Sequence, residues 1–435
     1  MSCNFTIALV FMNATLANPD DSTKFSAVRN SIPFVKQAVS ELTLDEAVRL
    51  ALANNPRVKA LVFDISAAEL GLAAAQALAN PNVTLNPGFT RAGSDEELMI
   101  SQPLEINGSR SARAGMASAQ LRVAESEALI ELREIVYETK SAYLQLARAQ
   151  ERNTLANDVV GNSEELDRIA QRQVELGSRP GIDRTQTSIE LTRARQQATL
   201  SGAEFAAARA ELNTIIGRPV GEIAVLPLLQ FSPQTIDESL ILQQAMGARA
   251  EIAASAATRE GFLQEARLAR AEGIPDIAPH FRATSLTRSP HENGFGIGIT
   301  IPLLDYGSRR NRIRQAEESA KAHEQRAAAV RNRVLREVSQ AVARLRAANA
   351  VLRMFQGGML DEARKVLEAT RNGFRIGGVS LLAVLEAQRT YRTVQAEYID
   401  ALASHEQARA QLERATGAVP TSVLKDLRSM ESKKQ

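Results

Sequence analysis

Apolar residues recur at alternating spacings of three and four along two long stretches of the chain, a pattern typical of helices packed side by side. Each position of the second stretch lies 199 residues after its counterpart in the first, as Val334 does after Ile135. Such a duplication constrains the architecture, because each copy must form the same supersecondary unit. The matched positions are Ile135, Thr139, Ala142, Leu146 and Ala149, and then Val334, Val338, Ala341, Leu345 and Ala348.

Each stretch is preceded by a short junction that contains proline and glycine. Pro103 and Gly108 form the first junction, and Pro302 and Gly307 repeat it 199 residues later. Neither stretch contains proline after its junction, so each predicts one uninterrupted helix of about 68 residues and about 100 Å. Average globular helices are far shorter, so these helices are rods.

The long helices are predicted at about 109–176 and 308–376. Shorter helices then return along them at about 181–216 and 380–415, after turns rich in glycine. Two pairs of extended segments precede the junctions, and proline is tolerated where such a strand ends. We predict strands at about 82–91, 97–103, 277–288 and 294–302.

These elements divide the chain into two structural repeats with the same order: helix, helix, strand, strand, long helix, shorter helix. The segments outside the repeats lack hydrophobic periodicity. The predicted divisions are a leader or flexible arm at 1–41, the first repeat at 42–217, a linker at 218–234, the second repeat at 235–417 and a disordered tail at 418–435.

Composition supports helical rods over a thick globular core. Aromatic residues make up 4% of the 435 residues and tryptophan is absent, so burial must come from alanine and leucine at helical seams. The net charge of +2 gives no reason to expect nucleic acid as a partner. One cysteine, Cys3, excludes a disulfide framework and leaves lipidation open. Residues 5–16 with Ala17 fit a secretory leader without its basic start, or a disordered tail.

No arrangement in the sequence supports catalysis, a cofactor or a metal site. No histidines pair at a metal-ligand spacing, and no Ser-His-Asp or Cys-His set can be assembled. We therefore predict that the protein is not an enzyme and binds no cofactor. The histidines are His280, His291, His323 and His405.

Four strands form a sheet with two open edges, which a membrane does not tolerate. Copies of the chain could close it: two would give eight strands and three would give twelve. A soluble coiled-coil scaffold is the alternative, but it does not explain the paired strands. An adaptor protein is a weaker alternative, because the chain lacks enough strands for a lipoyl-like domain.

The junctions and the glycine-containing turns resemble the TolC family of outer-membrane efflux ducts over about residues 42–417. The segment 102–113 is most similar to the CzcC-like branch of heavy-metal cation efflux systems. The resemblance implies a mainly α fold with a small β part: a homotrimer with a twelve-stranded transmembrane β-barrel in outer-membrane lipid and a periplasmic α-barrel. It also implies a periplasmic adaptor protein and an inner-membrane RND-type pump as partners.

The family's hairpin tips form the periplasmic entrance and dock the adaptor. Its best-known members carry acidic rings six and nine residues past the glycine of the second tip, positions held here by Ala383 and Glu386. Asp183 occupies the first of these places in the first repeat. Glu386 and Asp183 are therefore the gate candidates. The tips correspond to Gly177, Ser178, Arg179 and Gly181, and to Gly377, Gly378, Val379 and Ser380.

Overall fold

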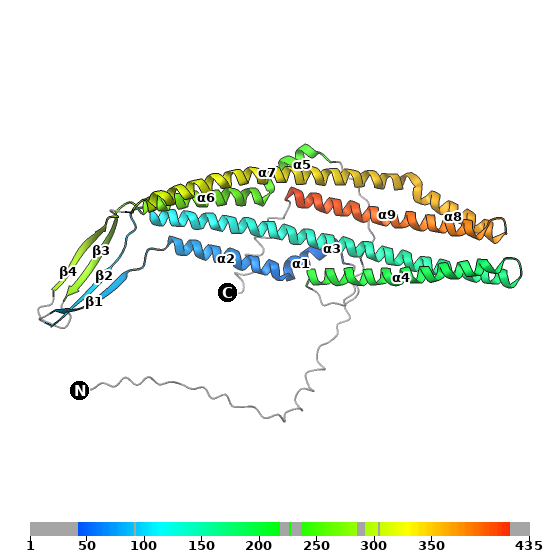
Figure 1. Cartoon of the computed structure of the whole chain (residues 1–435), viewed down its shortest axis with the longest axis horizontal. Coiled ribbons are helices and arrows are strands. Elements are labelled where there is room, and N and C mark those ends of the chain that lie inside the picture. The colour runs from blue at the N-terminus through cyan, green and yellow to red at the C-terminus, as the bar shows by residue number, and fades with distance from the viewer. Residues whose placement is uncertain are drawn as a thin grey trace, which may run out of the picture. The chain divides into compact units, whose positions relative to one another are not determined.

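The computed structural model describes residues 42–90, 93–217, 226–227, 236–284, 292–302 and 305–417. The predicted arm at 1–41, the tail at 418–435 and most of the linker at 218–234 lie outside these residues. The described part is mostly helical and contains one small sheet (Figure 1). The predicted class, long helical hairpins with few strands, is confirmed at this level.

The elements of the two repeats follow the same order. The first repeat contains α1 (Leu44–Asn54), α2 (Pro56–Gln76), β1 (Asn82–Thr90), β2 (Gly93–Ser101), α3 (Ser109–Glu175) and α4 (Gly181–Ile215). The second contains α5 (Glu238–Ala248), α6 (Ala250–Ala271), β3 (Asp276–Thr284), β4 (Glu292–Thr300), α7 (Ser308–Met354), a π-helical turn (Phe355–Met359), α8 (Leu360–Arg375) and α9 (Leu381–Thr416).

Local chemistry sets the first helix boundaries. Thr43 caps α1, because its side-chain oxygen accepts a hydrogen bond from the Glu46 backbone N–H at 3.3 Å. Asn55 caps α2 through the Arg57 N–H at 2.9 Å, and Pro56 occupies the first helical position, where its missing N–H costs nothing.

The strands form one antiparallel sheet in the order β1-β2-β3-β4. The sequence predicts that the second strand begins at about residue 97, but β2 already begins at Gly93, opposite Thr90, so the connection between the strands is shorter than predicted. One row of residues crosses all four strands on an apolar face: Val83, Ile100, Phe281 and Phe295. The next row faces the other side and is more polar: Thr84, Met99, Arg282 and Gly294.

The helices pack along the predicted seams. Ile135, Thr139 and Leu146 of α3 are fully buried, as are Val334 and Val338 of α7. Equivalent clusters gather α1 and α4 around α3, and α5 and α9 around α7. Fully burying a leucine or isoleucine contributes about 1.5–3 kcal/mol, so repeated seams of this kind can replace a globular core.

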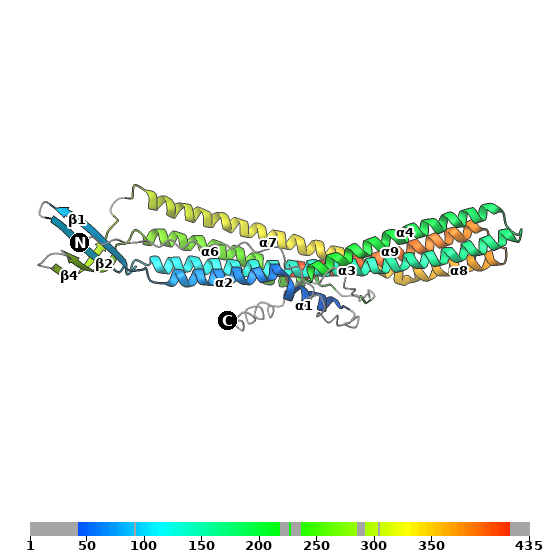
Figure 2. The same ribbon diagram turned by 90° about the horizontal axis from the view of Figure 1, so that it is seen from below.

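α3 joins the two repeats. It packs against α2 and α4 of its own repeat and against α6 and α9 of the other. Toward the tips, the hairpins α3–α4 and α8–α9 lie side by side in both views (Figures 1 and 2). The sheet lies at one end of α3 and the hairpin turns lie at the other (Figure 1).

The prediction of one uninterrupted α-helix at 308–376 is wrong, because this stretch is divided into α7 and α8. It contains a π-helical turn at Phe355–Met359, in which Gly358 has φ +107°. The reason lies in the duplication. The offset between the repeats is 199 at Ala348 but 200 at Gly377, so the second repeat carries one extra residue between them. A π-turn absorbs one residue and restores the helical register beyond it.

Candidate functional site

The two hairpin tips have the same backbone structure. Gly177 (φ +71°) and Gly377 (φ +82°) end their helices in the left-handed conformation that glycine adopts without strain. In the first tip, the N–H groups of Gly177 and Ser178 donate to the carbonyls of Val174 and Gln173, at 3.0 Å each. The second tip repeats this pair of bonds, which defines a Schellman motif.

Large apolar side chains are exposed at both tips. A soluble surface rarely concentrates exposed leucine and isoleucine at one end of a rod without a partner. The exposed residues of the second tip lie 200 positions after those of the first. The two tips therefore present equivalent apolar surfaces. The residues are Leu176 and Ile182 in the first tip and Ile376 and Leu382 in the second.

Arg179 links the two tips. Its Nη2 donates to the backbone carbonyl of Val379 at 3.2 Å, and its guanidinium lies 4.7 Å from the centroid of the buried Phe374 ring. It also lies 4.0 Å from the carboxylate of Asp183, one helical turn away. Tip residues from both repeats therefore meet at one arginine.

The two gate candidates lie in different surroundings. The Asp183 side chain is 15% exposed and is the ion-pair partner of Arg179. The Glu386 side chain is 65% exposed and lies 3.5 Å from Arg389 on the same face of α9. Ala383 donates its backbone N–H to the cap residue Ser380. Of the two carboxylates, Glu386 is therefore the more exposed to solvent.

The sheet–helix junctions also repeat. Gly108 (φ +87°) and Gly307 (φ +86°) precede α3 and α7 in the left-handed conformation. Pro103 follows the end of β2, and the next residue, Leu104, still donates to the Ile277 carbonyl at 3.0 Å. Pro302 lies two residues past the end of β4. Both prolines therefore lie just past the ends of their strands, and at Pro103 the backbone bonding to β3 continues for one more residue.

The first junction is held by an ion pair that the sequence motifs did not reveal. Arg113 donates two hydrogen bonds to the carboxylate of Glu105, at 2.7 and 3.1 Å. These bonds lower the pKa of Glu105 against the opposing effect of burial. Glu105 itself has φ +45°, so the pair holds a residue in a strained backbone conformation. The repeated arginine, Arg113 and Arg312, was the available signal, but its partner was not evident from sequence.

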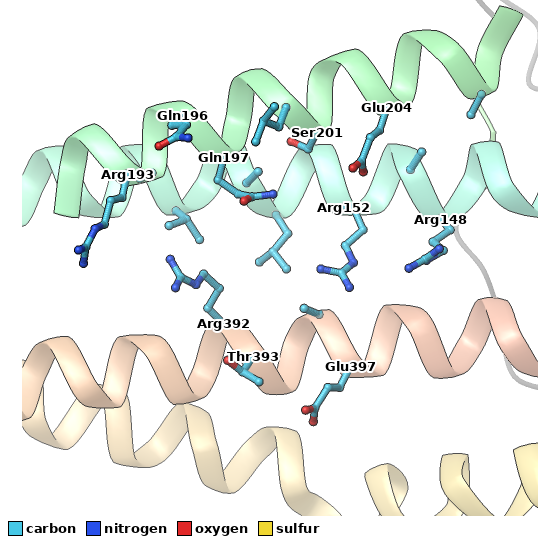
Figure 3. Close-up of a pocket in the computed structure, with 18 of the residues that line it drawn as sticks. Arg148, Arg152, Arg193, Gln196, Gln197, Ser201, Glu204, Arg392, Thr393 and Glu397 are labelled. Carbon is cyan, nitrogen blue, oxygen red and sulfur yellow. The ribbon is translucent and has the colours of Figure 1, made fainter. Parts of the chain in front are cut away.

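A groove of about 1020 Å³ lies over α3 between α4 and α9 (Figure 3). Four arginines line it: Arg148 and Arg152 from α3, Arg193 from α4 and Arg392 from α9. No sequence pattern groups these arginines, because they come from three helices and both repeats.

Within the described part of the chain, no group of three His, Cys, Asp or Glu side chains could hold a metal ion. His405 is buried, and its ring nitrogens lie 3.0 Å from oxygens of Glu406 and Asn349. It is thus a packed histidine in a polar network. None of the described helices has both the length and the hydropathy required to cross a membrane.

The chain is similar to several known proteins. A family model described as outer membrane efflux protein matches residues 47–218 and 241–418. The cobalt-zinc-cadmium resistance protein CzcC of Cupriavidus metallidurans is 24% identical, over 94% of this chain and 97% of its own. The pyoverdine export outer membrane protein OpmQ of Pseudomonas aeruginosa is also 24% identical, over 93% and 92%. The fold matches the Campylobacter jejuni CmeC outer membrane channel with a TM-score of 0.75 and 15% identity, over 97% of both chains.

Proposed function

The chain belongs to the outer membrane efflux protein family, and from this premise we propose that it forms a passive trimeric duct that exports solutes from the periplasm to the exterior. The resemblance to CzcC-like efflux channels found in the sequence is confirmed.

The apolar face of the sheet carries this proposal. Val83 and Leu85 of β1 and Ile297 and Ile299 of β4 expose large aliphatic side chains, and Phe295 is 91% exposed. This face suits lipid, and the more polar opposite face suits a wet lumen. A soluble scaffold would leave the apolar face in water, so the sheet favours the channel over that alternative.

Closure requires other copies of the chain. In the described sheet, β1 and β4 each pair on one side only, and open edges are not stable in a bilayer. We propose that three copies join these edges into a twelve-stranded barrel, which is wide enough to leave a channel. The rods then continue as a periplasmic α-barrel.

The hairpin tips are the proposed contact for a periplasmic adaptor, which would connect the duct to an inner-membrane RND-type pump. Support comes from the exposed Leu176, Ile182, Ile376 and Leu382, which would be covered by a partner. The paired Schellman turns hold these side chains at fixed positions. Arg179 would keep the two tips together as one docking surface.

We expect Glu386 to favour cations at the entrance. In planar lipid bilayers the purified protein should form discrete channels, and Glu386→Gln should reduce the cation-to-anion permeability ratio by about twofold or more, because a ring of carboxylates raises the local cation concentration. Single-channel reversal potentials measure this ratio.

Glu368→Gln is a matched control, since Glu368 is as exposed as Glu386 and is likewise paired with an arginine on its own helix. A selectivity change of the same size in both variants would reject the gate role. The absence of any conductance from the wild-type protein would reject the duct itself.

Divalent metal cations are the proposed cargo, because CzcC is named for cobalt, zinc and cadmium resistance. A strain that lacks this protein should become more sensitive to these ions, and the intact gene should restore tolerance. Growth inhibition by each ion measures the effect. OpmQ is named for export of an organic compound, so unchanged metal tolerance with new sensitivity to organic compounds would contradict the metal proposal.

A further inference from the structure

The second repeat makes helix contacts that the first repeat lacks. α6 and α9 pack against α7 of their own repeat and also against α3 of the first repeat. By the duplication, α2 and α4 are the counterparts of α6 and α9, and α3 is the counterpart of α7 with α8. Within the described residues, the extensive contacts of α2 and α4 are with helices of their own repeat. The outer sides of these two helices are therefore without the partner that the duplication leads us to expect.

The order of the helices shows which faces stay open. It is α2, α3, α6, α7 toward the sheet and α4, α3, α9, α8 toward the tips. In Figure 1, α7 and α8 thus run along one long edge, and α2 and α4 run along the opposite edge. The two edges of one chain do not meet, but the edge of one copy can join the opposite edge of the next. Such head-to-tail contacts close into a ring when the rotation between copies allows it.

Large apolar side chains are exposed on the open side of α2. Phe63 is 66% exposed and Leu70 is 68% exposed. At the 194-residue offset that relates α6 to α2, the counterpart of Leu70 is Gln264, whose side chain lies against Gly115 of α3. Leu70 thus lies on the side of α2 that corresponds to the α3-facing side of α6. Exposed apolar residues on such a side indicate a surface that is covered by a partner.

A charged contact between the repeats has apolar counterparts on the open edges. Asp400 of α9 accepts hydrogen bonds from Arg148 Nε and Arg152 Nε of α3, at 2.7 and 3.2 Å. All three residues are replaced at the offsets of 200 and 199. The counterparts are Leu200 on α4 and Ala347 and Val351 on α7.

The apolar counterparts are exposed in the single chain. Leu200 is 52% exposed and Val351 is 43% exposed, and Met354, one turn beyond Val351, is 69% exposed. If these positions meet between copies, the loss of all three charges together has a physical reason. A single remaining charge would be buried there without its partner, which is strongly unfavourable.

A second contact between the repeats has counterparts of opposite charge. Gln411 of α9 donates to the Tyr137 hydroxyl of α3 at 3.4 Å. The counterparts are Glu211 on α4 and Arg336 on α7, and both are exposed. Within the described residues neither of them has an ion-pair partner. A glutamate on one open edge and an arginine at the matching place on the other are complementary.

From these observations we propose that copies of this chain associate head to tail through α2 and α4 of one copy and α7 of the next, in imitation of the contact between the repeats. Leu200 of one copy packs against Ala347 and Val351 of the neighbouring copy, and Glu211 pairs with Arg336. This interface rests on the proposed closure of three copies and identifies the helix faces that join them.

Disulfide trapping of the purified full-length protein in detergent tests the interface. All variants carry Cys3→Ser, because Cys3 is the chain's only cysteine. After oxidation, Leu200→Cys with Val351→Cys should give covalent species of two and three chains on non-reducing electrophoresis. A bond within one chain is not expected, because α4 and α7 lie on opposite edges and a disulfide requires Cα atoms within about 7 Å.

Leu200→Cys with Val366→Cys is the matched control. Val366 of α8 is 55% exposed, but it lies 15 residues beyond position 351, or about 22 Å along the helix. This variant should remain as single chains. Equal cross-linking of the two pairs would overturn the interface. The absence of the Leu200–Val351 cross-link in a protein that light scattering shows to be a trimer would also overturn it and leave the duct intact, whereas a monomer would overturn both.

Transfer of the charged contact to the open edges is a second test. Leu200→Asp should raise the protein concentration at which half of the trimers dissociate by about tenfold or more, because it buries an unpaired carboxylate. Addition of Ala347→Arg and Val351→Arg should restore association, because the three residues then reproduce the contact that Asp400 makes within the chain.

Light scattering over a dilution series measures association of these variants, and circular dichroism verifies that each one is folded. Unchanged association of Leu200→Asp would overturn the interface. A triple variant that associates no better than Leu200→Asp alone would overturn it as well.

Discussion

Glu251→Ala should lower the free energy of unfolding by about 3–5 kcal/mol, because it leaves two buried arginines without their shared carboxylate. Arg133 of α3 and Arg249 at the start of α6 have side chains that are 7% and 4% exposed. Both donate two hydrogen bonds to Glu251, at 2.6 to 3.1 Å. The cluster joins the first repeat to the second.

Arg249 also connects Glu251 to the rest of the second repeat. It donates to Glu337 of α7 at 2.8 Å and to the Ala415 carbonyl near the end of α9 at 2.9 Å. In the first repeat, Asn54 and Asn55 bind the last carbonyls of α4 in the same way. The loss of Glu251 should therefore loosen three helices together.

The same cluster predicts acid sensitivity. Burial alone would raise the pKa of Glu251, but the hydrogen bonds from Arg133 and Arg249 lower it from 4.5 to about 2. A carboxylate whose pKa is lower in the folded state stabilises fully above its unfolded pKa and loses this contribution as the pH falls through its folded pKa. Between pH 4.5 and 2 the wild type should thus lose about 3 kcal/mol at this site.

Chemical denaturation followed by circular dichroism at neutral pH and at acidic pH measures both effects. Glu265→Ala is the control, since Glu265 is an exposed glutamate of the same helix. Equal stability of the two variants, or a wild-type protein whose acid transition matches that of Glu251→Ala, would contradict the role of the cluster.

Two single-glycine deletions should differ in their effect on the free energy of unfolding. Deletion of Gly358 removes the extra residue of the π-turn, so α8 keeps its register, and the free energy of unfolding should change by no more than about 1 kcal/mol. Deletion of Gly161 from α3 rotates the rest of that helix by about 100°. This moves Leu166 and Ala170 out of their buried positions and should cost at least about 3 kcal/mol.

Thermal unfolding and limited proteolysis of the hairpin compare the two deletions directly. The Gly161 deletion should expose cleavage sites between residue 161 and the first tip, and the Gly358 deletion should not. If both deletions destabilised the protein equally, the π-turn would be an essential kink and not the accommodation of an inserted residue.

Features that depend on neighbouring residues could be predicted from the sequence. The seam positions Leu146 and Leu345, the left-handed Gly177 and Gly377 and the cap at Thr43 follow from helical periodicity and glycine chemistry. The change in offset from 199 to 200 before the second tip indicates one extra residue in the second repeat. Hydrophobic periodicity did not show at which turn the helix accommodates this residue. That position depends on which turn can deform, and Gly358 tolerates a φ that other residues avoid.

The sequence by itself determined the duplicated order of rods, strands and turns, because each depends on side chains a few residues apart. Only the tertiary structure decided which charges meet: Arg179 with the Val379 carbonyl, Glu251 with Arg133 and four arginines at one groove. These partners lie as many as 244 positions apart, as Arg148 and Arg392 do. Their meeting depends on how each helix is rotated about its axis against its neighbours, which local periodicity does not encode.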